Sequence, residues 1–171
     1  MLRALAVGLS GLCLAACSGQ SAAPPSPAAT EALLAAGLHA QASGDLTRAD
    51  ADYLSVVKAQ PRNTLAWYNL GVIAQQHSLV AGAVTDYDRA IDANSRYVPA
   101  LYNLAILETK SDPKLAARLY QRCIEAEPRD ADAYLNLGYV ERALGNRTAG
   151  NDDIAEAVAL DPALAHSRTG S

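Results

Sequence analysis

The sequence predicts an all-α fold in which helical hairpins stack into a solenoid, and three observations carry this prediction. Half of the 171 residues are apolar, but only 5% are aromatic and 36 are alanine, a composition that disfavours β-sandwiches and barrels. Apolar side chains recur at helical spacing, as at Trp67, Leu70 and Ala74. Finally, small, aromatic and turn residues return about every 34 positions.

The charge of the chain excludes one class of partner. It has 14 basic and 18 acidic residues and a formal net charge of −4. No excess of positive charge is available to attract nucleic-acid phosphates, so a nucleic-acid-binding role is disfavoured.

Residues 1–16 have the three-part layout of a secretory signal peptide. Arg3 supplies the positive start, residues 4–14 form an apolar run, and the small pair Ala15-Ala16 precedes Cys17. The run is shorter than the roughly 20 residues that a membrane-spanning helix needs. We therefore expect a leader rather than a membrane span.

The residues Leu14-Ala15-Ala16-Cys17 resemble the lipobox of bacterial lipoproteins. The resemblance implies that the Cys17 sulfur carries a diacylglycerol with palmitate-type chains and that the bond before it is cut. Cys13 is a poorer candidate because it lies inside the apolar run. The alternative is a conventional cleavage site that leaves Cys17 without a lipid. Two or three acyl chains would hold the protein stably at a membrane, whereas one binds only marginally.

Residues 17–29 are expected to be an extended spacer between the lipid and the folded domain. Pro24, Pro25 and Pro27 lie there among small polar residues. Proline fixes φ and donates no N–H, so the segment that runs to Thr30 should adopt an extended, solvated conformation.

Three independent series of residues define the repeat. They are Gly37, Gly71, Ala105 and Gly138; Tyr53, Tyr87, Tyr120 and Ile154; and Pro61, Ser95, Pro128 and Pro162. Each series has a spacing of 34 residues that shortens to 33 once, which places a single deletion between Ala105 and Ala116.

These residues resemble the tetratricopeptide repeat pattern. Trp67-x-x-Leu70-Gly71 followed by Ala83, Tyr87 and Ala90 carries the resemblance in one unit, and Tyr134-x-x-Leu137-Gly138 with Ala157 and Pro162 carries it in another. The resemblance implies a right-handed α-solenoid of about four helix-turn-helix units over residues 30–164, with units at 30–63, 64–97, 98–130 and 131–164 and a tail at 165–171.

The sequence also predicts where each hairpin turns. Ser43-Gly44-Asp45, His77-Ser78 and Leu144-Gly145-Asn146 are residues that end one helix or cap the next. The shortened third unit turns at Ser111-Asp112-Pro113. Gly71 and Gly138 are expected to let the two helices of a hairpin lie close together. The short tail is expected to leave Val158 and Leu160 partly uncovered.

No catalytic or metal-binding pattern emerges from the sequence. His39, His77 and His166 occupy unrelated repeat positions, and no hydrolase motif or phosphate-binding loop is present. Cys123 occupies a position normally filled by a small buried residue and is expected to be a core thiol. We therefore expect no enzyme activity, no metal and no cofactor.

The first helix of each unit is expected to line a concave groove that binds a peptide or helix. The predicted apolar groove residues are Leu34, Leu38, Tyr68, Val72, Tyr102, Ile106, Leu135 and Tyr139. Tyrosine suits an interface because it combines a large rigid surface with a polar tip. The alternative for about half of these residues is packing beneath the next unit.

Asn69, Asn103 and Asn136 occupy the same position in three successive units. An amide both donates and accepts, so a ladder of amides could hold the backbone of an extended peptide. This arrangement resembles the asparagine ladders of some peptide-binding tetratricopeptide proteins. A purely local structural role is the equal alternative.

Two functional hypotheses follow. The first is a membrane-anchored adaptor or assembly factor that binds a peptide or helix of another envelope protein. The second is a structural lipoprotein that self-associates through its weakly capped last unit. The lipobox resemblance implies an envelope location, at the outer membrane facing the periplasm in a Gram-negative source and at the outer face of the cell membrane otherwise.

Overall fold

The computed structural model describes the backbone of residues 25–169 and the side chains of residues 25–165. Within this part of the chain it contains eight α-helices, a final 3-10 helix and no strand. The helices are α1 (Pro27–Ala42), α2 (Leu46–Ala59), α3 (Thr64–Gln76), α4 (Val80–Ala93), α5 (Val98–Ser111), α6 (Pro113–Ala126), α7 (Ala131–Ala143), α8 (Arg147–Leu160) and η1 (Pro162–Thr169).

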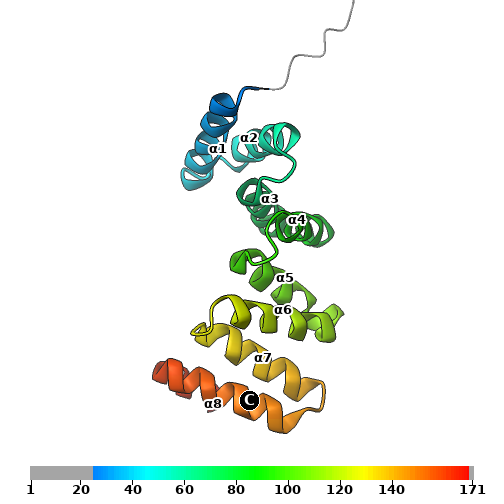
Figure 1. The fold of residues 1–171 in the computed structure, drawn as a ribbon, viewed down its shortest axis with the longest axis vertical. Helices are drawn as coiled ribbons and strands as arrows, with labels where there is room; N and C mark the ends of the chain where they lie inside the picture. Colours follow the sequence, from blue (N-terminus) through cyan, green and yellow to red (C-terminus); the bar gives the residue numbers. More distant parts are fainter. Residues whose placement is uncertain (1–24, 170–171) are drawn as a thin grey trace, which may run out of the picture.

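The helices pair into four hairpins that follow one another along the long axis of the molecule (Figure 1). Each hairpin joins the two helices of one predicted unit, and α2, α4 and α6 pack against the first helix of the next unit. The predicted all-α solenoid of four helix-turn-helix units is confirmed. None of the described helices is long and apolar enough to cross a lipid bilayer.

The first helix begins earlier than the sequence predicted. Residues 27–30 were expected to belong to the extended spacer, but they form the first turn of α1. Ser26 caps this turn by accepting a hydrogen bond from the Ala29 N–H, and Pro27 occupies the first helical position, where its missing N–H costs nothing. Pro27 therefore starts the helix. Cys17 and the leader lie outside the described residues.

The turns inside the hairpins follow the sequence prediction. Gly44 and Gly145 adopt the left-handed backbone conformation, with φ of 83° and 92°. Asp45 and Asp112 cap α2 and α6 by accepting the N–H groups of Arg48 and Leu115 at 3.1 and 2.9 Å. In the shortened third unit Asp112 alone separates α5 from α6, so the single deletion removes turn residues and leaves the helices intact.

Each of the first two hairpins closes on a glycine that contacts a tyrosine ring. A Cβ atom added to Gly37 would lie 2.7 Å from Cε1 of Tyr53, and one added to Gly71 would lie 2.6 Å from Cε1 of Tyr87. Both rings are fully buried. In the fourth unit, where Ile154 replaces the tyrosine, Gly138 and Gly150 face each other across the hairpin.

The second-helix tyrosines are also held at their hydroxyl ends. Tyr53 donates to Oε1 of Gln41 and Tyr87 donates to Oε1 of Gln75, both at 2.8 Å. The two glutamines are themselves 34 residues apart, so they belong to the same repeat position. Each bond ties the second helix of a hairpin to the end of the first.

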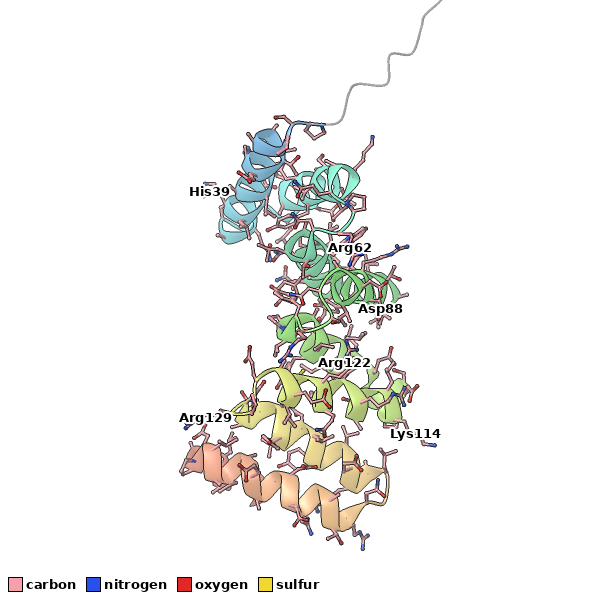
Figure 2. All side chains as sticks on the ribbon, viewed as in Figure 1. His39, Arg62, Asp88, Lys114, Arg122 and Arg129 are labelled. Carbon is pink, nitrogen blue, oxygen red and sulfur yellow. The ribbon has the colours of Figure 1, made fainter. Side chains whose placement is uncertain are left out.

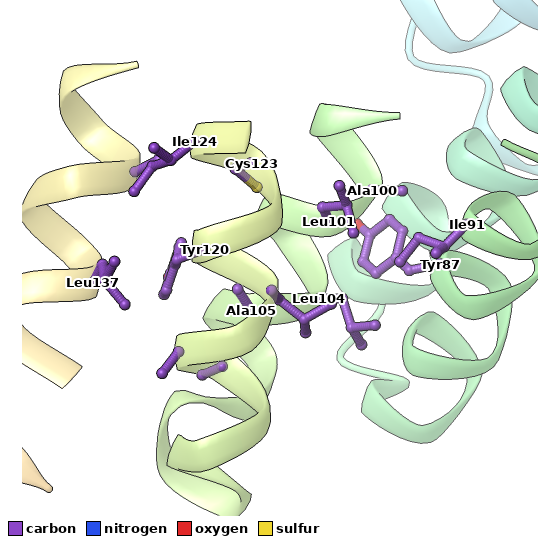
Figure 3. Packing of buried hydrophobic residues seen from close by; sticks show 14 of the residues in the cluster. Tyr87, Ile91, Ala100, Leu101, Leu104, Ala105, Tyr120, Cys123, Ile124 and Leu137 are labelled. Carbon is purple, nitrogen blue, oxygen red and sulfur yellow. The ribbon is translucent and has the colours of Figure 1, made fainter. Parts of the chain in front are cut away.

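The main apolar core runs through the second, third and fourth units (Figure 3). Tyr87, Leu104 and Tyr120 are buried in it, together with Cys123. A second cluster fills the first unit and its contact with α3, and a small third cluster lies at the C-terminal end. The half-buried Trp67 packs against both of the larger clusters.

Arginines between the units help to fix how neighbouring hairpins stack. Arg62 donates to the backbone oxygen of Asp92 at 3.3 Å, and Arg96, one unit later, donates to that of Glu125 at 3.4 Å. Both acceptors lie in the last turn of the following second helix, whose carbonyl groups lack partners and favour a cation. Arg62 lies beside α3 and α4 in Figure 2.

The C-terminal end is partly covered. Leu164 of η1 packs against the cluster of Leu135, Ile154 and Ala157. Val158 and Leu160 are half-buried, as the short tail led us to expect. The 3-10 helix therefore supplies a small cap where a full solvating helix is absent from the described residues.

The glycine–tyrosine contact gives a first prediction. We expect Gly71→Ala to lower the free energy of unfolding by about 1–2 kcal/mol, because the overpacking against Tyr87 exceeds the gain in helix propensity of about 1 kcal/mol. The matched control is Gly82→Ala on α4, where the nearest atom lies 3.7 Å away and the change should be neutral or stabilising. Urea unfolding followed by circular dichroism measures both. Equal stability of the two variants would contradict the packing argument.

Candidate functional site

The candidate groove is built from the first helices of the four units, α1, α3, α5 and α7. On each helix two predicted groove residues are four positions apart and therefore lie on the same face, one turn above the other. The earlier residues form the inner row, which is Leu34, Tyr68, Tyr102 and Leu135. The later residues form the outer row, which is Leu38, Val72, Ile106 and Tyr139.

The outer row is the exposed one. Leu38, Ile106 and Tyr139 have exposed fractions of 40%, 45% and 38%, and Val72 is half-buried. One apolar side chain per unit thus reaches the surface at the same repeat position. This recurrence makes the four side chains the candidates for a binding surface.

The inner row takes part in packing between helices. The Tyr68 ring lies 5.9 Å from the Tyr87 ring and 5.4 Å from the Tyr97 ring, and the Tyr102 ring meets the edge of Tyr120 at 5.6 Å. These distances are typical of stabilising aromatic pairs.

The other two inner-row residues are also covered. Leu34 is half-buried against the cluster of the first unit, and Leu135 is 9% exposed in the C-terminal cluster. For Leu135 the packing alternative therefore holds. The inner row is therefore largely covered by neighbouring side chains, and the outer row is the accessible part of the candidate groove.

The three asparagines do not form a ladder of free amides. Asn69 is 6% exposed and donates to the backbone oxygen of Leu65 in its own helix at 2.8 Å. Asn103 donates to the hydroxyl of Tyr87 at 3.2 Å, and Asn136 donates to the hydroxyl of Tyr102 at 2.6 Å. Three amides at one repeat position thus have three different partners. These bonds favour a structural role over the peptide-binding role, and this role is local for Asn69 only.

The tyrosine hydroxyls of this network stay neutral. Burial raises the pKa of Tyr87 to about 12, a shift that the hydrogen bond from Asn103 opposes. Burial and the nearby Asp132 raise the pKa of Tyr102 to about 12. A neutral hydroxyl can donate and accept at once, so Tyr87 links Gln75 to Asn103.

Sequence reasoning missed this hydrogen-bonded network. Gln41, Gln75 and Thr109 occupy one repeat position, and Tyr53, Tyr87 and Tyr120 occupy another. The sequence did contain a signal for it. A polar residue recurs 11 or 12 positions before each of these tyrosines, and a buried tyrosine hydroxyl needs a hydrogen-bond partner.

The histidines and the cysteine of the described residues lie apart from one another and from any metal-binding cluster. No group of three or more His, Cys, Asp or Glu side chains there could hold a metal ion. His39 is exposed on α1 and points away from the stack in Figure 2. Burial raises the pKa of the Cys123 thiol to about 12, and the thiol lies 4.0 Å from the backbone oxygen of Val98. Cys123 is therefore a packed core thiol, since the thiolate is the nucleophilic form.

Two family models described as tetratricopeptide repeat match the chain, one over residues 34–99 and one over residues 119–159. Together they cover more than half of it. The chain belongs to the tetratricopeptide repeat family. No curated protein sequence matches the chain.

Solved structures of other tetratricopeptide repeat proteins have the same fold. A crystal structure of MamA superposes with a TM-score of 0.71 at 22% identity, covering 80% of this chain and 81% of that one. A repeat protein from Parabacteroides merdae gives 0.70 at 20% identity, with 79% and 54% covered. YrrB, described as having an unusual peptide-binding site, gives 0.66 at 20% identity, with 78% and 70% covered. At these identities the likeness shows the fold alone.

The hydrogen bonds of the three asparagines give a second prediction. We expect Asn69→Ala, Asn103→Ala and Asn136→Ala each to lower the free energy of unfolding by about 0.5–1.5 kcal/mol, because each removes an intramolecular hydrogen bond. Asn151→Ala on α8 is the matched control, since Asn151 is exposed and should tolerate alanine. Thermal and urea unfolding measure the effect. Three variants as stable as the parent chain would favour the peptide-binding role of the amides instead.

Proposed function

We propose that this tetratricopeptide repeat protein is a non-catalytic adaptor or assembly factor of the bacterial envelope. It binds a peptide or helix of another envelope protein along the outer row of the groove, Leu38, Val72, Ile106 and Tyr139. The observation that carries the proposal is the exposure of an apolar side chain at the same position in successive units. The solenoid holds these side chains on a rigid surface, which suits the binding of a segment that extends across several units.

Membrane attachment through Cys17 is the second part of the proposal. The leader of residues 1–16 and the lipobox-like sequence that ends at Cys17 support it. Residues 17–26 would then separate the lipid from α1. A tethered adaptor gains from this geometry because attachment to one surface raises the local concentration of the partner.

Self-association through the last unit is less well supported. Leu164 already covers part of the C-terminal cluster, so the apolar area left at that end is reduced to the half-buried Val158 and Leu160. The outer row offers more exposed apolar surface and spans all four units.

The groove proposal predicts a site-specific crosslinking pattern. We expect p-benzoylphenylalanine placed at Leu38, Ile106 or Tyr139 of the full chain to crosslink one and the same envelope protein in intact cells. The same group at Arg118, exposed on the second helix of the third unit, is the matched control and should not crosslink it. Ile106→Asp should weaken binding of that protein by about tenfold or more, because it removes the burial of an isoleucine side chain. Adducts at Arg118, or different proteins at the three groove positions, would contradict the proposal.

The anchor proposal predicts which cysteine is acylated. In a bacterial host fed an alkyne analogue of palmitate, we expect the full chain to take up the label and to sediment with membranes. Cys17→Ala should abolish both properties, and Cys13→Ala, the matched control four residues earlier, should retain them. Gel fluorescence and membrane fractionation measure the outcome. Label that survives in the Cys17→Ala variant would show that the anchor is assigned to the wrong residue.

A further inference from the structure

A second surface lies at the junction of the first two units, outside the groove. A cavity of about 380 Å³ opens there between α2, α3 and α4. Its apolar wall includes Leu46, Leu70 and Ile73, and its polar wall carries Asp50 and Asp86. Gly82 also lines it, at a position where the other units have Arg48, Leu115 and Ala149.

The cavity faces away from the groove. Leu70 and Ile73 line it from α3, whereas Tyr68 and Val72 of the same helix belong to the groove. Leu70 is two residues away from both Tyr68 and Val72. At about 100° per residue, it therefore lies about 160° around the helix axis from each of them. The two surfaces are therefore on opposite faces of α3, and a ligand in the cavity would not occupy the groove.

The turn beside the cavity departs from the other hairpin turns at two positions. The first and fourth units have Gly44 and Gly145 in the left-handed conformation, but the second unit has Ser78 there, with φ of 59°. The next residue, Leu79, occupies the N-cap of α4 and makes no side-chain cap bond. Units one and three have capping aspartates at this position.

Both departures cost stability. A non-glycine residue in the left-handed region costs about 1–2 kcal/mol, and loss of a polar N-cap costs about 1 kcal/mol. In return, Leu79, which lines the cavity, is 61% exposed, and the next residue along α4, Val80, is 52% exposed. Among the described hairpin turns, that of the second unit alone combines a left-handed residue other than glycine with an apolar residue at the N-cap. Local rules are broken in this way most often where a surface has a function.

The charges in the cavity indicate what it binds. At the junction of the second and third units, the residues equivalent to Asp50 and Asp86 are Val84 on α4 and Leu119 on α6. Both pack into the main core. At the first junction two carboxylates replace this apolar pair. Burial, and then the charge of Asp50, raise the pKa of Asp86 to about 6. No cation of the described residues pairs with either carboxylate, and the nearby ion pair is Arg48 with Asp52 at 3.8 Å. His77 also lines the cavity.

We propose that this cavity binds a lysine or arginine side chain of a protein partner, with a neighbouring apolar side chain of the same partner seated on Leu79 and Val80. The cation would lie between Asp50 and Asp86, and its aliphatic stem would contact Leu70 and Ile73. A long basic side chain combines these two needs, since it buries its stem while its charged end pairs with carboxylates. This surface is additional to the groove and does not depend on what the groove binds.

A displayed library of random 12-residue peptides, selected against the purified full chain, tests the proposal. We expect the recovered peptides to carry a lysine or arginine beside a large aliphatic or aromatic residue. Synthetic peptides of these sequences should bind the D50N/D86N variant at least about tenfold more weakly, because two charge-assisted interactions are lost. Leu79→Ser should weaken binding as well, by removing the apolar seat.

Two control variants separate binding in the cavity from a general effect of charge and from binding in the groove. The D88N/D92N variant removes the same charge at exposed positions of α4 outside the cavity, and should bind the peptides as the parent chain does. Ile106→Asp alters the groove and should also leave this binding unchanged. The D50N/D86N variant should melt at or above the temperature of the parent chain, because the substitutions remove two carboxylates that repel each other.

The proposal is overturned if no recovered peptide depends on the two carboxylates, or if D88N/D92N weakens binding as much as D50N/D86N. It is also overturned if the full chain forms a dimer that dissociates in D50N/D86N, since the occupant would then be a second copy of this chain. The proposed function is tested separately. If the D50N/D86N variant still binds the groove partner normally, the proposed function stands even when the cavity proposal fails.

Discussion

The contact between a glycine of one helix and a tyrosine ring of the next sets the geometry of the first two hairpins. Gly37 and Gly71 leave no room for even a methyl group in front of Tyr53 and Tyr87. Because the rings sit this close, their hydroxyls reach Gln41 and Gln75 at the far end of the first helix. Tyr87 then continues the network into the next unit by accepting from Asn103. The close contact between helices and the polar link between units therefore both depend on the tyrosine that packs against the glycine.

Much of the fold could be predicted because the repeat is an internal comparison. The spacing shortens from 34 to 33 residues in all three series, and this located the deletion in the third unit. The structure has the shortened turn there, at Ser111-Asp112-Pro113. The start of α1 could not be obtained in this way, because the first helices of the other three units begin at the position equivalent to Thr30, whereas α1 begins at Pro27. Prolines there were interpreted as part of a spacer, although Ser26 and Pro27 also fit the start of a helix. In the structure Ser26 accepts the Ala29 N–H, and its carbonyl accepts the hydroxyl of the buried Thr30, so the helix starts at Pro27.

The groove was predicted less completely than the fold, for a physical reason. Sequence register fixes the face of a helix, but it does not fix which of two residues on that face is covered by the neighbouring helix. Leu34 and Leu38 share a face, yet only Leu38 is exposed. The asparagines show the same limit, because an amide at a fixed repeat position can turn toward its own backbone, as in Asn69, or toward a tyrosine of another helix, as in Asn136. These choices depend on neighbours that differ from unit to unit.

The solenoid also explains how the chain can carry a cavity at one junction. In a stack each unit contacts only its neighbours, so the cost of Ser78, Leu79 and the Asp50–Asp86 pair stays at one interface. The main core of units two to four does not include that interface, and Arg62 bridges the same two units through the Asp92 carbonyl. A globular domain with one shared core would spread the same cost over the whole fold. The repeat architecture thus allows one junction to contain a cavity and two exposed apolar side chains without disturbing the packing of the other units.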